Sequence, residues 1–182
     1  KEFTARVDRK GGESIGTITF KKRNASRRYT DSVIWEDVSI ESEIYNYDAI
    51  RTQEYSSAVI SLKDGTKIEL DQNTMLVVIL SEKGLDINSD RGGVSAQSGS
   101  GTANPITLNS RDATIALDKG DVSVNSTDGG MDIVVNSGNA KVAAGGSDID
   151  ISPDRITSLK NGVVESKKVS LFPAAPGRNS YI

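Results

Sequence analysis

Polar and apolar residues alternate in short runs along most of this chain, over residues 48–171. The runs end at Gly, Asn, Asp or Ser, as the run at residues 58–62 does before Asp64-Gly65. A period of two turns every second side chain to the same face, so each run is typical of a half-buried β-strand. The pattern predicts an all-β fold without helices.

Beyond residue 80 the predicted strands become regular and their side chains become small. They cover residues 85–88, 93–97, 106–108, 113–118, 121–125, 131–136, 140–144, 148–152, 156–159 and 163–166. Two such strands form a unit of about 18–20 residues, which is the size of a solenoid rung. No aromatic residue stands between Tyr55 and Phe172. We therefore favour a β-solenoid or β-roll of short strands, with an antiparallel β-sandwich as the alternative that fits the same spacing.

A chain of 182 residues predicts a single domain, here over residues 1–171. Its front part, residues 1–91, carries the denser apolar pattern. A Gly/Ser-rich loop is predicted at residues 92–105, and a repetitive strand ladder at 106–171. Residues 172–182 contain two prolines and a glycine and predict an extended linker.

Composition narrows the classes of partner. Apolar residues make up 36% of the chain, below the usual figure of about 45–50%, so the core is expected to be thin. The formal net charge of −3 argues against nucleic acid as a partner, because a phosphate-binding surface needs an excess of Lys and Arg. The basic run at residues 21–28 is interpreted as a solvated loop, with contact to anionic lipid or polymer as the alternative.

The chain contains neither cysteine nor histidine. This composition excludes disulfides, thiolate metal sites, cysteine nucleophiles and histidine-based catalysis. We predict that the protein is not an enzyme and that it has neither a cofactor nor a metal site. No apolar run of about 18 residues predicts a membrane span in this chain, which reads as a part of a longer protein.

Acidic residues on strands offer two weaker candidates for chemistry. Asp148 and Asp150 share one strand face, as do Glu41 and Glu43 if that segment is extended. A pair of carboxylates can act as a glycosidase acid and base, but alternating acids usually mark the wet face of a strand. Residues 145–151 resemble a calcium-binding β-roll turn, for which a solvated turn is the better interpretation.

Aromatic and arginine side chains gather in the front part of the chain. Tyr45, Tyr47, Arg51 and Tyr55 are candidate binding residues, because exposed Tyr and Arg are common in recognition surfaces. A packing cap on the first strands is the plainer interpretation of the same residues. Trp35, the one tryptophan, is expected to anchor one end of the core, with a surface ligand platform as the alternative.

A motif spans residues 35–80 with unbroken spacing. Its positions are Ile44, Asp48, Ile50, Arg51-Thr52, Ser57-Ala58, Ile60, Leu62, Asp64-Gly65-Thr66, Ile68, Leu70 and Thr74. This pattern resembles the FecR domain family, and the Trp-Glu-Asp step at residues 35–37 resembles its spirochaete branch. A glycine that often follows the Thr of that family is Gln53 here.

The resemblance implies a bacterial, non-catalytic, periplasmic or otherwise extracytoplasmic domain, with a membrane anchor expected elsewhere in the full-length protein. Its expected role is sensing, signalling or scaffolding at the cell envelope, with an envelope protein or a cell-wall or surface polymer as partner. It does not by itself imply regulation of a sigma factor. The alternatives are a polysaccharide-binding solenoid and a structural or adhesin stalk.

The motif also has a direct physical interpretation, in which its polar residues make the fold. Asp48 can accept backbone N–H groups at a corner, and Thr52 can hydrogen-bond in the turn that follows. Asp64-Gly65 is a sharp reversal between two strands, because Gly accepts a positive φ without steric cost. We assign Trp35, Asp48, Thr52, Asp64, Gly65 and Thr74 as structural motif residues.

Overall fold

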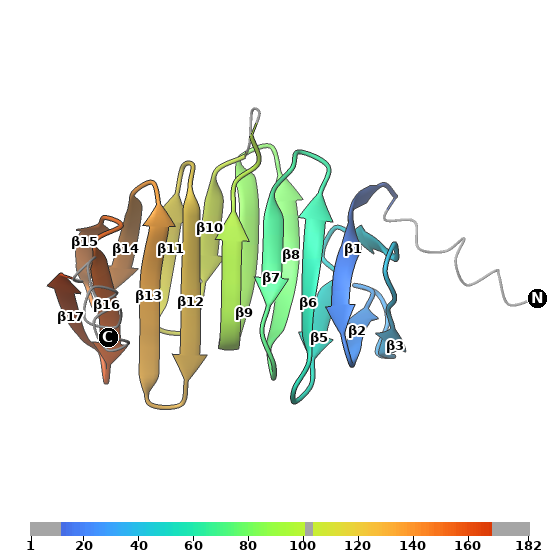
Figure 1. Cartoon of the computed structure of the whole chain (residues 1–182), viewed down its shortest axis with the longest axis horizontal. Helices are drawn as coiled ribbons and strands as arrows, with labels where there is room; N and C mark the ends of the chain where they lie inside the picture. Colours follow the sequence, from blue (N-terminus) through green and yellow to red (C-terminus); the bar gives the residue numbers. More distant parts are fainter. Residues whose placement is uncertain (1–11, 101–103, 169–182) are drawn as a thin grey trace, which may run out of the picture.

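The computed structural model describes residues 12–100 and 104–168, and all regular structure within them is β-strand. The predicted linker at residues 172–182 lies outside the described residues. The all-β class is therefore confirmed for the described part of the chain. Figure 1 shows an elongated molecule whose strands run side by side in two layers.

The strands form two hydrogen-bonded layers, sheet A and sheet B, which share strand β9. Sheet A has the order β4 (Glu43–Tyr45), β1 (Ser14–Lys22), β6 (Ser57–Leu62), β7 (Lys67–Leu70), β9 (Gly84–Gln97), β12 (Asp121–Thr127), β13 (Gly130–Ser137), β16 (Arg155–Lys160) and β17 (Val163–Lys168). Sheet B has the order β3 (Glu36–Asp37), β2 (Ala25–Arg28), β5 (Ala49–Thr52), β8 (Met75–Ser81), β9, β10 (Ile106–Asn109), β11 (Ala113–Leu117), β14 (Ala140–Ala144) and β15 (Ser147–Ile151).

Strand β9 crosses from one sheet to the other. Its first half pairs with β8 and β10, and its second half pairs with β7 and β12. At the crossing, Gly92 has a φ of 100°, and a Cβ there would lie 2.2 Å from the Oγ1 of Thr74. Two predictions overlap at residues 93–97, a strand and the Gly/Ser-rich loop of residues 92–105, and the structure has the strand there, which runs to Gln97. The glycines of that segment permit a close approach between backbones rather than a flexible connection.

The rear part of the chain alternates between the layers in hairpins. Strands β12 and β13 form a hairpin in sheet A, β14 and β15 one in sheet B, and β16 and β17 one in sheet A. Two successive hairpins of one sheet are separated in the chain by a hairpin of the other sheet. They nevertheless pair with each other, β11 with β14 in sheet B and β13 with β16 in sheet A. The chain thereby extends both layers together.

The favoured β-solenoid is not confirmed. In a solenoid each strand lies parallel to the strand one rung away, whereas among the described strands only β9 and β10 pair in parallel. The result is an open, mixed all-β arrangement of two layers, closer to the sandwich alternative. Strand length and turn spacing are the same in both folds, so the sequence pattern did not separate them.

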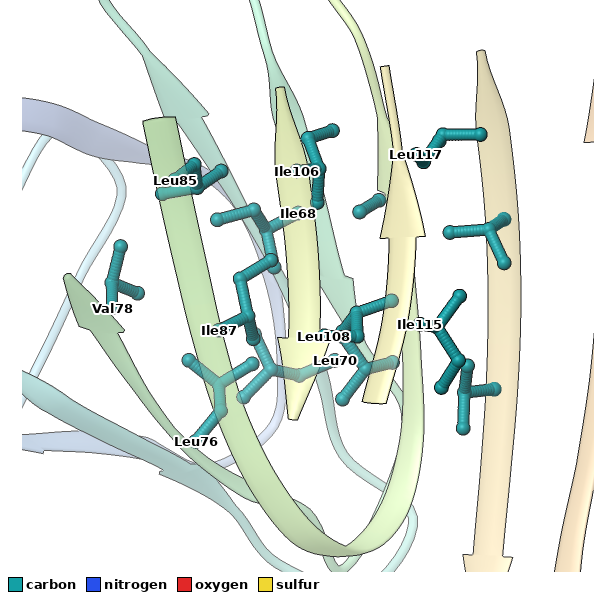
Figure 2. Packing of buried hydrophobic residues seen from close by; sticks show 14 of the residues in the cluster. Ile68, Leu70, Leu76, Val78, Leu85, Ile87, Ile106, Leu108, Ile115 and Leu117 are labelled. Atoms are coloured by element: carbon teal, nitrogen blue, oxygen red, sulfur yellow. The ribbon is translucent and has the colours of Figure 1, made fainter. Parts of the chain in front are cut away.

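Inward-pointing residues of both sheets meet in one apolar core. Strand β11 alternates buried and exposed residues along its whole length, as the sequence pattern predicted. In Figure 2 the side chains of Ile68 and Leu70 from sheet A lie in the same interior as those of Ile87, Leu108 and Ile115 from sheet B. Each such buried side chain contributes about 1.5–3 kcal/mol of hydrophobic stabilisation.

Asp64, in the turn between β6 and β7, forms hydrogen bonds with Thr66 and with Asn104, which lies two residues before β10. Asp64 Oδ1 accepts the backbone N–H of Thr66 at 2.9 Å, and its Oδ2 accepts the Nδ2 of Asn104 at 3.0 Å. Burial of the carboxyl raises its pKa, but the hydrogen bonds from Thr66 and Asn104 outweigh burial, so the pKa of Asp64 lies below its ordinary value of 3.8. The ionised carboxylate therefore stabilises the folded state.

The pH dependence of this contribution can be measured. Because the pKa is lowered on folding, the stabilisation is present above about pH 4 and is lost as the pH falls through the folded pKa. The unfolding free energy of Asp64→Asn, measured by urea denaturation, should fall short of the wild-type value at pH 7. This gap should narrow below pH 4. A gap of constant size from pH 7 to pH 3 would contradict the role of the charge.

The crossing of β9 predicts a second stability effect. Gly92→Ala should lower the free energy of unfolding by about 2–4 kcal/mol, because it adds backbone strain and a contact with Thr74 that must be relieved. Gly129→Ala is the matched control, since a Cβ there meets nothing within 4 Å. The control should change stability by less than about 0.5 kcal/mol. Equal effects of the two substitutions in urea denaturation would show that the close approach is unimportant.

Candidate functional site

A buried ion pair fixes the front end of the molecule. Arg27 in β2 donates from Nη1 to the Oδ2 of Asp48 at 3.1 Å and to the carbonyl oxygen of Glu43 at 2.6 Å. The two side chains of the pair are 8% and 1% exposed. Asp48 Oδ2 also accepts the backbone N–H of Tyr45 at 2.9 Å, at the corner between β4 and β5. The basic run predicted as a solvated loop therefore contains a strand whose Arg27 is internal.

An aromatic cap covers this ion pair. The guanidinium carbon of Arg27 lies 4.3 Å from the ring centroid of Tyr29, and the rings of Tyr29 and Tyr45 are 6.1 Å apart. Tyr45 is half-buried and belongs to this cap. The plainer interpretation, packing, describes the surroundings of Tyr45 better than a free recognition surface does.

Trp35 lies on the surface of sheet B and not in the core. Its ring centroid is 5.0 Å from the guanidinium carbon of Arg28 and 4.0 Å from that of Arg51. The ring is half-buried and outside the apolar core cluster, so the expectation of a core anchor is wrong. Strand alternation in β2 turns Arg28 to the outer face, opposite Arg27, and Trp35 lies against Arg28 on that outer face. Cation–π contacts at exposed positions contribute about 0.5–1 kcal/mol each.

The four predicted binding residues do not form one cluster. Tyr47 lies in the turn before β5, with a φ of 70°, and Arg51 lies within β5. Tyr55 lies beyond the other end of β5, with the guanidinium carbon of Arg23 5.9 Å from its ring centroid. Tyr47 and Tyr55 are exposed, and Arg51 is the member that joins the Trp35 surface.

The remaining motif residues hold turns together. Thr52 Oγ1 donates to the carbonyl oxygen of Asp71 at 2.5 Å and accepts the backbone N–H of Thr74 at 3.2 Å. Thr74 Oγ1 in turn accepts the backbone N–H of Gly93 at 3.0 Å, at the crossing of β9. These side chains are buried and satisfy backbone groups, which is the structural role assigned to them above.

Strand register creates a groove beside Trp35 that sequence reasoning missed. Across the outer face of sheet B, Arg51 is paired with Met75 and Met75 with Arg91. A groove of about 570 Å³ follows this row and includes Val77 and Asn88 in its lining. Alternation alone marks Met75 as an outward position of its strand. Only the pairing of β5, β8 and β9 brings Met75 between two arginines.

The described residues contain no group of three acidic side chains arranged to hold a metal ion. Asp148 and Asp150 are exposed on β15, and Asp150 pairs with Lys141 at 3.8 Å. Glu41 adopts a φ of 77° in the turn before β4, so Glu41 and Glu43 do not share one strand. Within the same residues, no helix has the length and apolarity of a membrane span.

Comparison with known proteins places the chain in a family. The sequence profile of the FecR protein family matches residues 48–141, more than half of the chain. The chain therefore belongs to the FecR family. The match confirms the resemblance seen at residues 35–80 and extends it across β9 into the rear part of the fold.

One relative is an uncharacterised protein from Treponema pallidum (strain Nichols), 25% identical over 185 residues. The alignment covers 97% of this chain but 27% of that protein, so the chain spans about a quarter of the length of this relative. Its spirochaete source agrees with the branch that the sequence pattern indicated.

Two crystal structures, each of a proposed anti-sigma factor from Parabacteroides distasonis, share the fold. Their TM-scores are 0.61 and 0.60, at 16% and 15% identity. The matches cover 70% and 71% of this chain and 62% and 64% of those chains. At these identities the likeness shows the fold, and membership of the family rests on the sequence profile.

The buried ion pair makes a stability prediction. Asp48→Ala should lower the free energy of unfolding by about 3–5 kcal/mol, because it leaves Arg27 buried without its carboxylate. The matched control is Asp150→Ala, which breaks the exposed contact with Lys141 and should cost less than about 1 kcal/mol. Urea denaturation of both variants checks this. Similar losses in the two variants would contradict a special role for the buried pair.

Proposed function

We propose that this FecR domain is a non-catalytic regulatory module that binds an envelope protein outside the cytoplasm through the Trp35 surface. We define this surface by Trp35, Arg28 and Arg51 together with the adjacent Val33 and Ile34. The observation that carries the proposal is the stacking of two guanidinium groups on one half-exposed indole ring. Membership of the FecR family supports the regulatory class.

The chemistry of the Trp35 surface is that of a protein interface. Val33 is 88% exposed and Ile34 is 64% exposed, directly before the indole. Trp and Arg are enriched among the residues that dominate binding energy, and apolar neighbours exclude water around them. Among the described residues, none forms a salt bridge with Arg28 or Arg51. Their charges are therefore available to a partner.

A polymer partner is the second candidate, and a different groove favours it. On the outer face of sheet A a groove of about 540 Å³ is lined by hydroxyl, amide and carboxylate groups, among them Ser95, Asn125 and Asp132. Such groups can hydrogen-bond sugar hydroxyls. The aromatic and cationic chemistry of the Trp35 surface matches a protein interface more closely, so we rank the polymer second.

The partner can be trapped at the proposed surface. The full-length protein would carry the photocrosslinker benzoylphenylalanine in place of Ile34 in living cells, with Asn136 on sheet A as the control position. We expect a defined adduct at position 34 only, which mass spectrometry identifies. The identified partner, purified, should bind Trp35→Ala and Arg51→Ala at least tenfold more weakly than wild type in calorimetry.

Lys67→Ala, on the outer face of sheet A, is the matched control and should leave this affinity unchanged. Equal affinity of wild type and Trp35→Ala would reject the Trp35 surface as the binding face. A glycan array serves the second candidate. Glycan binding that Trp35→Ala leaves intact, without a protein adduct at position 34, would favour the polymer and sheet A.

A further inference from the structure

We infer that the groove between Arg51 and Arg91 binds an extended acidic segment of the protein partner, and that Asp128 occupies Arg91 in the free protein. The inference rests on the proposed function, because the groove adjoins the Trp35 surface through Arg51. It adds the chemical class of the bound segment and a competing group supplied by the chain itself.

The groove is built by strand pairing. Arg51 of β5 lies beside Met75 of β8, which lies beside Arg91 of β9. Neighbouring strands are about 4.8 Å apart, so the two arginine backbones are roughly 10 Å apart, with one methionine between them. An extended segment advances about 3.3 Å per residue and can therefore place acidic side chains at both arginines.

The residues that line the groove include more bases than acids, unlike the protein as a whole. Its lining contains two cations, Arg51 and Arg91, and one acid, Asp90, although the whole chain has a net charge of −3. Three other grooves are lined by more acids than bases. The Asp128 carboxylate, which lies outside the lining and pairs with Arg91, offsets this excess of positive charge in the free protein. An acidic partner that takes the place of Asp128 meets both arginines, which favours it over a neutral or basic one.

Arg51, at one end of the groove, is held in place by its neighbours. Arg51 donates from Nε to the Oγ of Ser26 at 3.3 Å and stacks on Trp35, which fixes the guanidinium while leaving it without a described carboxylate partner. Fixing an arginine before binding lowers the entropy that binding must remove. Arg51 is thus a preorganised anion contact.

Arg91 already carries a carboxylate. Its Nη2 donates to the Oδ1 of Asp128 at 2.5 Å, at the turn between β12 and β13. Both side chains are mostly exposed, and exposed ion pairs contribute little net stability, so a partner carboxylate can replace Asp128 at small cost. The Asp128 carboxylate shows that an acidic side chain can bind Arg91. In the free protein it competes for Arg91 with the acidic side chain of an incoming segment.

The floor of the groove adds apolar contact. Met75 is 48% exposed between the arginines, and Val77 follows on the same face of β8. Methionine adapts to different apolar side chains. Asn88 and Thr52 also line the groove, and the amide of Asn88 can hydrogen-bond a peptide backbone. In an extended segment that alternates acidic and apolar residues, the acidic side chains share one face. They can therefore meet the two arginines while their methylene groups contact Met75.

A synthetic probe tests the groove directly. Fluorescein-labelled acetyl-Glu-Leu-Glu-Leu-Glu-Leu-amide and its Gln-for-Glu counterpart are titrated with the protein by fluorescence anisotropy. We expect the Glu peptide to bind at least tenfold more tightly than the Gln peptide. Arg51→Gln and Arg91→Gln should each weaken the Glu peptide about tenfold, since each removes a charge-assisted contact. Asp128→Asn should strengthen it about two- to fivefold.

Two further variants separate binding from folding. Met75→Lys should tighten and Met75→Glu should weaken the Glu peptide, opposite changes that a loss of fold does not produce. Lys141→Gln, on the same sheet outside this groove, should have no effect. Equal binding of the Glu and Gln peptides, or of wild type and both arginine variants, overturns the inference.

The same variants distinguish failure of this inference from failure of the proposed function. If the trapped partner loses affinity with Trp35→Ala but not with Arg91→Gln, the Trp35 surface stands and the acidic-segment groove is rejected. If Trp35→Ala has no effect while the Glu peptide still requires Arg51 and Arg91, the groove stands and the proposed docking surface is rejected.

Discussion

The close approach of Gly92 to Thr74 is the constraint on which the arrangement of the two sheets depends. It lets one strand, β9, leave sheet B and enter sheet A, with a register shift in its pairing to β8 just before the crossing. Every strand before β9 is thereby connected to every strand after it in both layers. In sheet A, the second half of β9 is the link between β7 and β12. Thr74 contributes twice, through this contact and through its hydrogen bond to Gly93.

The front end shows how one strand supplies both stability and a surface. Arg27 and Arg28 are adjacent in β2, and the alternation of the strand sends one inward and the other outward. Arg27 is buried against Asp48, which fixes the corner before β5. Arg28 lies against Trp35 on the outer face. The ion pair holds the strand that presents the surface, so the two roles depend on each other physically.

The sequence profile places the chain in the FecR family, and the two Parabacteroides structures share its fold. The chain spans about a quarter of the length of its Treponema relative. Within the domain, the features that distinguish one face from another are charge and aromatic content. These set the outer face of sheet B at its front end apart from the acidic, hydroxyl-rich face of sheet A.

The sequence by itself determined the strands, because a two-residue period is a local property of the chain. The segment at residues 140–144 was predicted with the bounds that the structure has, and the turn at Asp64-Gly65 reverses the chain as its residues require. The motif at residues 35–80 also identified the family. Of the four predicted binding residues, Arg51 is the one that contacts Trp35.

Tertiary structure decided what depends on the neighbours of each strand. The spacing of strands along the sequence does not show whether neighbouring strands run parallel or antiparallel. The solenoid was therefore favoured, although the described strands pair antiparallel except β9 with β10. Composition predicted a loop from residue 92 although alternation predicted a strand at residues 93–97, because the benefit of Gly92 comes from its contact with Thr74, a residue distant in the chain. The pair of Arg27 with Asp48 and the row from Arg51 to Arg91 join residues far apart in the chain. Register between strands, set by the packing of two sheets on one core, brought them together.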